Sequence, residues 1–285
     1  MPSTRRPNER SHHHRVFIQS ITAVLASILI LAFTSCKRSE PSTVPREDKL
    51  VVFAAASLRD VFTVMGDDLK RSHPGVEITF NFAGTQELRT QLEHGATVDV
   101  FASADQRHMD ELLWATRVAA PATFARNEPV VVVAKEQTAT LRAFADLPLA
   151  NRVVIGTPEV PIGRYTLQIL DRASQSLGSD FRTRVEAKVV SRELNVRQVL
   201  AKVSLGEADA GIVYRTDAIT AQERLGILTI PPEVNVIADY PIAVISGAPH
   251  PGLARDWVQF VLSTAGQQAL QRAGFIAPSG SAITR

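Results

Sequence analysis

Two hydroxyl-bearing residues stand where predicted strands end and predicted helices begin. Ser57 follows the apolar residues 51–56, and Thr85 follows Gly84 after the alternating segment 76–82. A helix start presents backbone N–H groups without a helical partner, together with the positive end of the helix dipole. The alanines before Ser57 leave room ahead of its helix, and Gly84 lets the backbone approach a ligand closely. We therefore expect a small anion to bind here, held by hydroxyl and amide groups.

Each of these hydroxyls also has a purely structural alternative. Ser57 precedes Asp60 by the spacing of a capping box, in which the serine only satisfies the backbone of its own helix. Thr85 can likewise be a plain N-cap of the helix that follows it. The local patterns leave both alternatives open.

Three further positions offer uncharged donors. The turn at residues 160–165 leads into a helix, where Pro161 cannot donate a hydrogen bond but the Ile162 N–H can. Asn195 is an expected cap, and Val196 after it can offer its backbone N–H. Tyr214 ends the apolar strand 210–214, where it is either a rim aromatic or a phenolic donor that reaches a cleft.

Charged residues offer a competing chemistry. Arg164 can reach an anion from the start of its helix, although an arginine at such a place commonly points to solvent. Asp99 and Asp105 could act in catalysis or hold a metal. Asp105 has the alternative role of a helix cap, and Asp99 stands at the start of an apolar strand.

Several classes of function lack their signatures. The chain has no Gly-x-Ser-x-Gly elbow, Walker loop or His-Glu-x-x-His motif, and its single cysteine is Cys36, near the N-terminus. A formal net charge of +2, no basic stripe and 6% aromatic residues exclude a nucleic-acid surface. We expect a binding protein without a cofactor rather than an enzyme.

The elements that position these residues alternate between strand and helix from residue 50 onward. Continuous apolar runs such as residues 50–54 are typical of parallel strands covered on both faces. The pattern predicts an α/β fold with two doubly wound lobes. We expect residues 48–127 and 240–285 to form lobe one, and residues 128–239 to form lobe two.

The first 36 residues have the composition of an export signal. An arginine-rich start precedes the apolar residues 16–32, and small residues precede Cys36. The junction resembles a bacterial lipobox, which would make Cys36 a lipidated residue that anchors the protein to a membrane. The alternative is an uncleaved membrane anchor. Both place the globular part outside the cytoplasm, in the periplasm or at the cell surface, after a flexible tether at 37–48.

Six motifs occur in one order along the chain. They are Ala-Ala-Ala-Ser-Leu, Phe-Ala-Gly-Thr, Asp-Val-Phe-Ala-Ser-Ala-Asp, Pro-Ile-Gly-Arg-Tyr, Asn-Val-Arg and Gly-Ile-Val-Tyr-Arg-Thr-Asp-Ala. Together they resemble the substrate-binding proteins of bacterial ABC-type molybdate importers, over nearly all of residues 49–276. The resemblance implies a type 2 periplasmic-binding-protein fold, in which the two lobes are joined by a hinge. It also implies a monomer, an ABC permease as partner, and molybdate or tungstate as the ligand.

The resemblance also assigns the ligand contacts. It implies that Ser57 and Thr85 contribute a hydroxyl and a backbone N–H each, that Ile162 and Val196 contribute backbone N–H groups, and that Tyr214 contributes its hydroxyl. Thr85 replaces the serine, and Ile162 the alanine, that are common in the family. The alternatives are a binding protein for another solute, such as a different oxyanion, and an exported enzyme.

Overall fold

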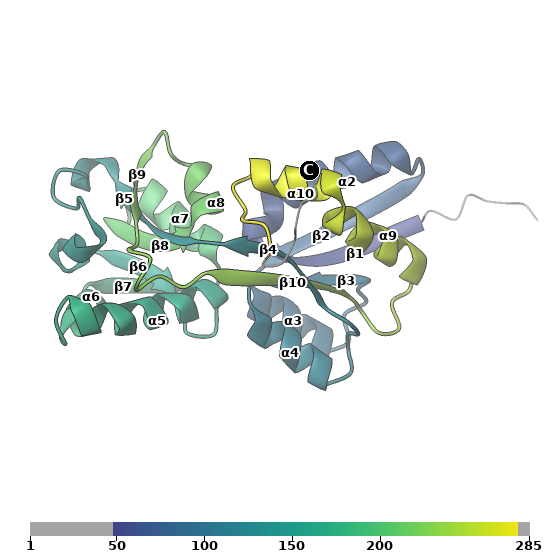
Figure 1. Cartoon of the computed structure of the whole chain (residues 1–285), viewed down its shortest axis with the longest axis horizontal. Coiled ribbons are helices and arrows are strands. Elements are labelled where there is room, and N and C mark those ends of the chain that lie inside the picture. Colours follow the sequence, from purple (N-terminus) through teal and green to yellow (C-terminus); the bar gives the residue numbers. More distant parts are fainter. Residues whose placement is uncertain (1–47, 279–285) are drawn as a thin grey trace, which may run out of the picture. The chain divides into compact units, whose positions relative to one another are not determined.

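A computed structural model of the chain describes residues 48–278. These residues form two five-stranded sheets with helices packed on their faces (Figure 1). The strands are β1 (Asp48–Ala55), β2 (Val76–Ala83), β3 (Val100–Ala102), β4 (Ala122–Asn127), β5 (Pro129–Ala134), β6 (Val153–Gly156), β7 (Val189–Glu193), β8 (Ala210–Tyr214), β9 (Leu225–Thr229) and β10 (Ala238–Val244). The export signal, Cys36 and most of the tether predicted from the sequence lie outside the described residues.

The longer helices follow the expected periodicity of apolar residues. The α-helices are α2 (Arg59–Ser72), α3 (Thr85–Glu93), α4 (Gln106–Trp114), α5 (Pro161–Ser176), α6 (Phe181–Glu186), α7 (Val196–Ser204), α8 (Arg215–Ile219), α9 (Pro251–Leu262) and α10 (Thr264–Arg272), and short 3₁₀ turns are η1 (Ala56–Leu58), η2 (Lys135–Gln137) and η3 (Phe144–Leu149). In α2, for example, Val61, Phe62, Met65 and Leu69 recur at helical spacing and are buried.

The first sheet has the strand order β2-β1-β3-β10-β4, and we call it with its helices lobe one. Strand β1 pairs in parallel with β2 and β3, so its apolar residues are covered by helices on both faces. Figure 1 shows α2, α9 and α10 on one face and α3 and α4 on the other. Strand β10 runs antiparallel to both β3 and β4.

The second sheet has the strand order β7-β6-β8-β5-β9, and we call it with its helices lobe two. Strand β6 pairs in parallel with β7 and β8, whereas β5 runs antiparallel to β8 and β9. All six residues of β5 are buried, as expected for a strand in the middle of a covered sheet. Helices α5 and α6 lie on one face, and α7 and α8 on the other (Figure 1).

The chain passes between the two sheets twice. Only Glu128 separates β4 of the first sheet from β5 of the second, and the chain returns through β10 after β9. The predicted α/β class with two lobes is confirmed. Neither sheet is wholly parallel, because β5 and β10 enter their sheets from the other lobe and so run against their neighbours.

Some details differ from the sequence-based expectation. Strands β4 and β9 and the short helices α6 and α8 were not predicted, since segments of five or six residues are too short to show a clear period. Within residues 48–278, no helix combines the length and apolar character needed to cross a membrane.

Candidate anion-binding site

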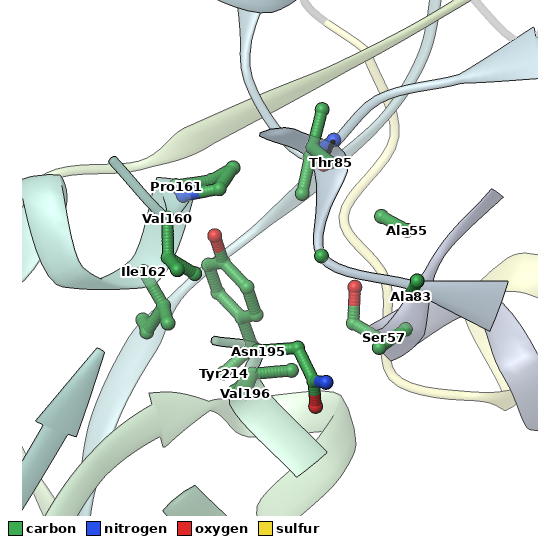
Figure 2. Close-up of a pocket in the computed structure, with 13 residues that line it drawn as sticks. Ala55, Ser57, Ala83, Thr85, Val160, Pro161, Ile162, Asn195, Val196 and Tyr214 are labelled. Carbon is green, nitrogen blue, oxygen red and sulfur yellow. Dashed lines mark hydrogen bonds between the residues drawn. The ribbon is translucent and has the colours of Figure 1, made fainter. Parts of the chain in front are cut away.

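A small cavity lies where the starts of several helices from both lobes meet (Figure 2). It holds about 220 Å³ of space free of atoms, including its open mouth. Such dimensions suit a compact guest of few atoms. The lining residues are Ala55, Ala56, Ser57, Ala83, Gly84, Thr85, Ala104, Val160, Pro161, Ile162, Asn195, Val196 and Tyr214.

The five ligand contacts expected from the sequence all line this cavity. They come from distant parts of the chain and from both lobes. None of the lining residues is a lysine, arginine, histidine, aspartate or glutamate, so the cavity wall offers uncharged groups alone. An anion held here would be stabilised by oriented dipoles rather than by opposing side-chain charges.

Three helices begin at the cavity. Thr85, Pro161 and Val196 are the first residues of α3, α5 and α7, and each lines the cavity. The first turn of an α-helix has N–H groups without intrahelical acceptors, and the helix dipole places partial positive charge there. The N–H groups of Ile162 and Val196 belong to these first turns. This arrangement favours a small anion.

The hydroxyl of Ser57 does not cap a helix. The structure contradicts the capping-box alternative, because Ser57 lies in the middle of η1, and α2 begins only at Arg59 without a side-chain cap. Ser57 Oγ instead lies 2.9 Å from the hydroxyl of Tyr240. The Ser57 hydroxyl is therefore paired with a tyrosine far away in the sequence, whereas the local pattern predicted a bond to the backbone of its own helix.

Thr85 is the first residue of α3, and Gly84 takes the N-cap position. The plain N-cap alternative for Thr85 is therefore wrong; the Gly84 N–H is satisfied by Glu87 Oε2 at 3.0 Å. Thr85 Oγ1 accepts a hydrogen bond from the Ala104 N–H at 3.2 Å. Because this contact uses the threonine oxygen as an acceptor, its hydrogen is free to be donated into the cavity.

The hydroxyl of Tyr214 is the polar atom that gives the most information about what the cavity can bind. Its side chain is buried, and its hydroxyl forms no hydrogen bond with the residues that the structure describes. Figure 2 shows that hydroxyl directed into the space between α5 and Thr85. Burial is the main cause that raises the pKa of Tyr214 well above its usual value, so the group stays protonated and can donate. Because an unpaired buried donor costs free energy, this hydroxyl is a candidate ligand contact.

The charged candidates have other roles. Arg164 does not line the cavity, and it does not simply point to solvent: its Nη2 lies 3.0 Å from Asp105 Oδ2. Asp105 also caps α4 by accepting from the His108 N–H, as expected. Asp99 accepts hydrogen bonds from the N–H groups of Val51 and His250. Among the described residues, no group of three or more histidine, cysteine or acidic side chains is placed to hold a metal ion.

Four polar contacts join the lobes around the cavity. Gln86 Nε2 donates to the carbonyl of Leu194 at 2.7 Å, and His108 Nε2 lies 3.0 Å from the carbonyl of Glu159. The other two are ion pairs. One is Arg164 with Asp105, and the other joins Arg197 of α7 to Asp60 of α2 at 2.5 Å. These contacts hold the two sets of donors around one space.

The residues that support the site from behind were not predicted from the sequence. Tyr240 belongs to no local motif, and Arg197 ends the Asn-Val-Arg motif without any sign of its partner; the partners of both lie far away in the sequence. The only available signals were an isolated tyrosine at the expected return to lobe one and an arginine directly after the candidate donor Val196.

Comparison with known proteins places the chain among solute-binding proteins. Residues 50–276 match the model of the family described as bacterial extracellular solute-binding protein. A relative from Mycobacterium tuberculosis (strain H37Rv), named molybdate-binding protein ModA, is 38% identical over 264 residues, which cover 90% of this chain and 97% of that protein.

Solved structures support the fold. The periplasmic molybdate-binding protein of Azotobacter vinelandii has a TM-score of 0.71 at 17% identity, covering 80% of this chain and 99% of its own. The sulfate-binding protein SubI of Mycobacterium tuberculosis has a TM-score of 0.73 at 17% identity, covering 82% and 88%. Since proteins named for two different oxyanions share this architecture, the fold alone does not select the ligand.

Proposed function

Because the chain belongs to the family of bacterial extracellular solute-binding proteins, we propose that its cavity captures molybdate, and tungstate with it, for delivery to an ABC importer. The fold is that of a two-lobed type 2 periplasmic binding protein. The proposal involves binding and release, with no chemical reaction and no cofactor. It includes the permease of the importer as the partner, a monomer as the working form, and a lipid anchor at Cys36 outside the cytoplasm.

One observation carries the choice of ligand class: a small cavity whose wall offers neutral donors and no charged side chain. A dianion accepts hydrogen bonds through every oxygen and donates none. The candidate contacts are the hydroxyls of Ser57, Thr85 and Tyr214 and the N–H groups of Ile162 and Val196. All of these are donors, and Tyr214 has no other partner among the described residues. The geometry is therefore complementary to a fully deprotonated oxyanion.

The strength of binding follows from the number of donors. A hydrogen bond to an ion contributes roughly 1.5–3 kcal/mol. Association and ordering oppose this by at least ~4 kcal/mol. About six such bonds of about 2 kcal/mol each would then leave about 8 kcal/mol, which corresponds to micromolar binding. Donors on both lobes must touch the same guest, so size decides selectivity: sulfate is smaller than molybdate, and some donors would stay buried and unpaired around it.

Titration calorimetry with molybdate, tungstate and sulfate tests this proposal. We expect molybdate and tungstate to bind with dissociation constants of about 1 µM or less. Sulfate should bind at least about tenfold more weakly, because each unmade bond to a buried donor costs about 1–3 kcal/mol. Equal or tighter binding of sulfate would assign the protein to another oxyanion. The absence of heat with all three would point to a different class of solute.

The Tyr214 hydroxyl gives a residue-level test. In the Tyr214→Phe variant, molybdate should bind roughly 10- to 150-fold more weakly, because one hydrogen bond to the ion is lost. The melting temperature without ligand should not fall, since that hydroxyl has no partner among the described residues. Calorimetry and a ligand-free thermal melt measure the two effects separately. A variant that binds like the wild type would remove Tyr214 from the site.

A further inference from the structure

The hydroxyls of Ser57 and Tyr240 form a buried hydrogen bond behind the cavity. The two oxygens are 2.9 Å apart, although the residues are separated by 183 positions in the sequence. Ser57 lines the cavity, whereas Tyr240 does not. Tyr240 belongs to β10, the strand through which the chain returns to lobe one. The distance alone leaves open which hydroxyl donates.

Asn127 indicates the direction of this bond. Asn127 ends β4, immediately before the first crossing between the sheets, and its Oδ1 accepts from the Glu128 N–H at 3.0 Å. That contact identifies the other end of the amide as the nitrogen. Nδ2 donates to Thr216 Oγ1 at 2.8 Å and, over a longer 3.4 Å, to the Tyr240 hydroxyl. Since the tyrosine oxygen accepts here, its single hydrogen is available for Ser57.

We propose that Tyr240 is a positioning residue of the anion site, whose hydroxyl donates to Ser57 Oγ and so directs the Ser57 hydrogen into the cavity. The inference rests on the proposed function, because it assigns a role toward the same bound oxyanion. Ser57 has one hydrogen and can give it either to Tyr240 or to the guest. With Tyr240 as donor, Asn127 donates to Tyr240, Tyr240 donates to Ser57, and Ser57 donates to the oxyanion. Each hydrogen bond polarises the next.

The opposite direction would be unfavourable for an anion. If Ser57 donated to Tyr240, the serine would present lone pairs to the cavity, where they would repel the oxygens of the guest. Thr85 faces the same choice, and there the Ala104 N–H decides it, because a backbone amide can only donate. Tyr240 would perform for Ser57 the task that a backbone amide performs for Thr85.

The ring of Tyr240 is held independently of its hydroxyl. It packs edge-on against the rings of Phe124, Tyr214 and Phe275, with centroids 6.3, 5.7 and 5.5 Å away. Phenylalanine preserves these contacts and removes one oxygen. Tyr240→Phe therefore changes the hydrogen-bond chain while leaving the packing in place, and a ligand-free thermal melt checks that the variant folds.

A double-mutant cycle on the full-length protein tests the proposal, with molybdate binding measured by calorimetry for the wild type, Tyr240→Phe, Ser57→Ala and the double variant. Tyr240→Phe alone should weaken binding about three- to tenfold, the effect of one net hydrogen bond. In the Ser57→Ala background the same change should weaken binding less than twofold, because the hydroxyl that Tyr240 orients is already absent. Such non-additivity is not expected from a purely structural role.

Tyr165→Phe is the matched control, since the chain has three tyrosines and Tyr165 is a buried one that does not line the cavity. Its effect should be the same with and without Ser57. The proposal fails if Tyr240→Phe binds like the wild type, or if its effect is equally large in both backgrounds. If the wild type itself does not bind molybdate, the proposed function fails instead, so the two failures are distinguishable.

Discussion

Replacing Gly84 with alanine is expected to weaken molybdate binding by more than about 100-fold. A methyl group built at Gly84 would overlap the carbonyl oxygen of Leu194 and lie 2.6 Å from Gln86 Oε1. The Gln86 side chain can rotate away, but the Leu194 oxygen is backbone of lobe two and cannot. The methyl group would therefore hold the lobes apart. Losing two hydrogen bonds to the ion already costs about 3–6 kcal/mol, which exceeds 100-fold.

The loss should appear in binding and hardly in folding. Gly84 is the N-cap of α3, where alanine is less favourable than glycine, so the free energy of unfolding should fall by about 1 kcal/mol at most. Calorimetry and ligand-free denaturant unfolding separate the two quantities. Gly252→Ala is the matched control, because a methyl group there, in α9, meets no atom within 4 Å. Normal affinity in Gly84→Ala would mean that the ligand does not need the lobes to approach at Leu194.

The second large effect concerns Arg197, which directly follows the candidate donor Val196 in the sequence. Its Nη2 pairs with the exposed Asp60 of lobe one, and its Nε lies 2.6 Å from Oδ1 of Asp217, whose side chain is fully buried. Neither Asp217 carboxylate oxygen has a well-aligned hydrogen bond with the described residues, so Arg197 compensates that charge mainly by proximity. Burial raises the pKa of Asp217 to about 6, against the opposing effect of Arg197.

Arg197→Met should lower the free energy of unfolding by about 3–5 kcal/mol at pH 7.5, because it leaves a buried carboxylate without its partner. The loss should shrink at pH 5. Asp217 has a folded pKa above its ordinary 3.8, so the folded state binds more protons than the unfolded state between these values, and stability falls as the pH rises through that window. Without Arg197 the pKa of Asp217 in the folded state is higher still, so stability continues to fall up to a higher pH. Denaturant titrations at both pH values measure this.

Two further variants make the result specific. Adding Asp217→Asn to Arg197→Met should restore most of the stability at pH 7.5, since an amide carries no charge to bury. Asp60→Asn alone should cost less than about 1 kcal/mol, because Asp60 is 55% exposed and exposed ion pairs contribute little. A loss that is equal at both pH values, or that Asp217→Asn does not relieve, would contradict this account of Arg197.

The amino-acid sequence was sufficient for the α/β class, the two lobes and a set of candidate donors. These inferences depend on local physics. Apolar runs such as residues 50–54 require covered strands, and a hydroxyl at a strand-to-helix junction marks unpaired N–H groups whatever the rest of the fold does. The structure brings five candidate donors to one cavity: Ser57, Thr85, Ile162, Val196 and Tyr214. Their role as ligand contacts remains a prediction.

Local patterns failed where a distant partner competes with the nearby backbone. Ser57 has the spacing of a capping box, yet its hydroxyl bonds to Tyr240, because the return of the chain through β10 brings a better-placed phenol against it. Arg164 was weighed as a ligand contact or a solvent-facing side chain, and it is neither, because Asp105 of the other lobe is within reach. No periodicity or motif records such pairings.

Only the tertiary structure shows which groups surround each hydroxyl and what limits the approach of the lobes. A hydroxyl can donate or accept, and only its neighbours in space, such as the Ala104 N–H beside Thr85, choose between the two. Likewise, Gly84 is recognisable in the sequence as a flexible residue, but the carbonyl of Leu194 that leaves no room for a side chain there lies 110 positions away in the other lobe. The residue types determine which groups can bind a ligand, and the two chain crossings determine which of these groups lie together.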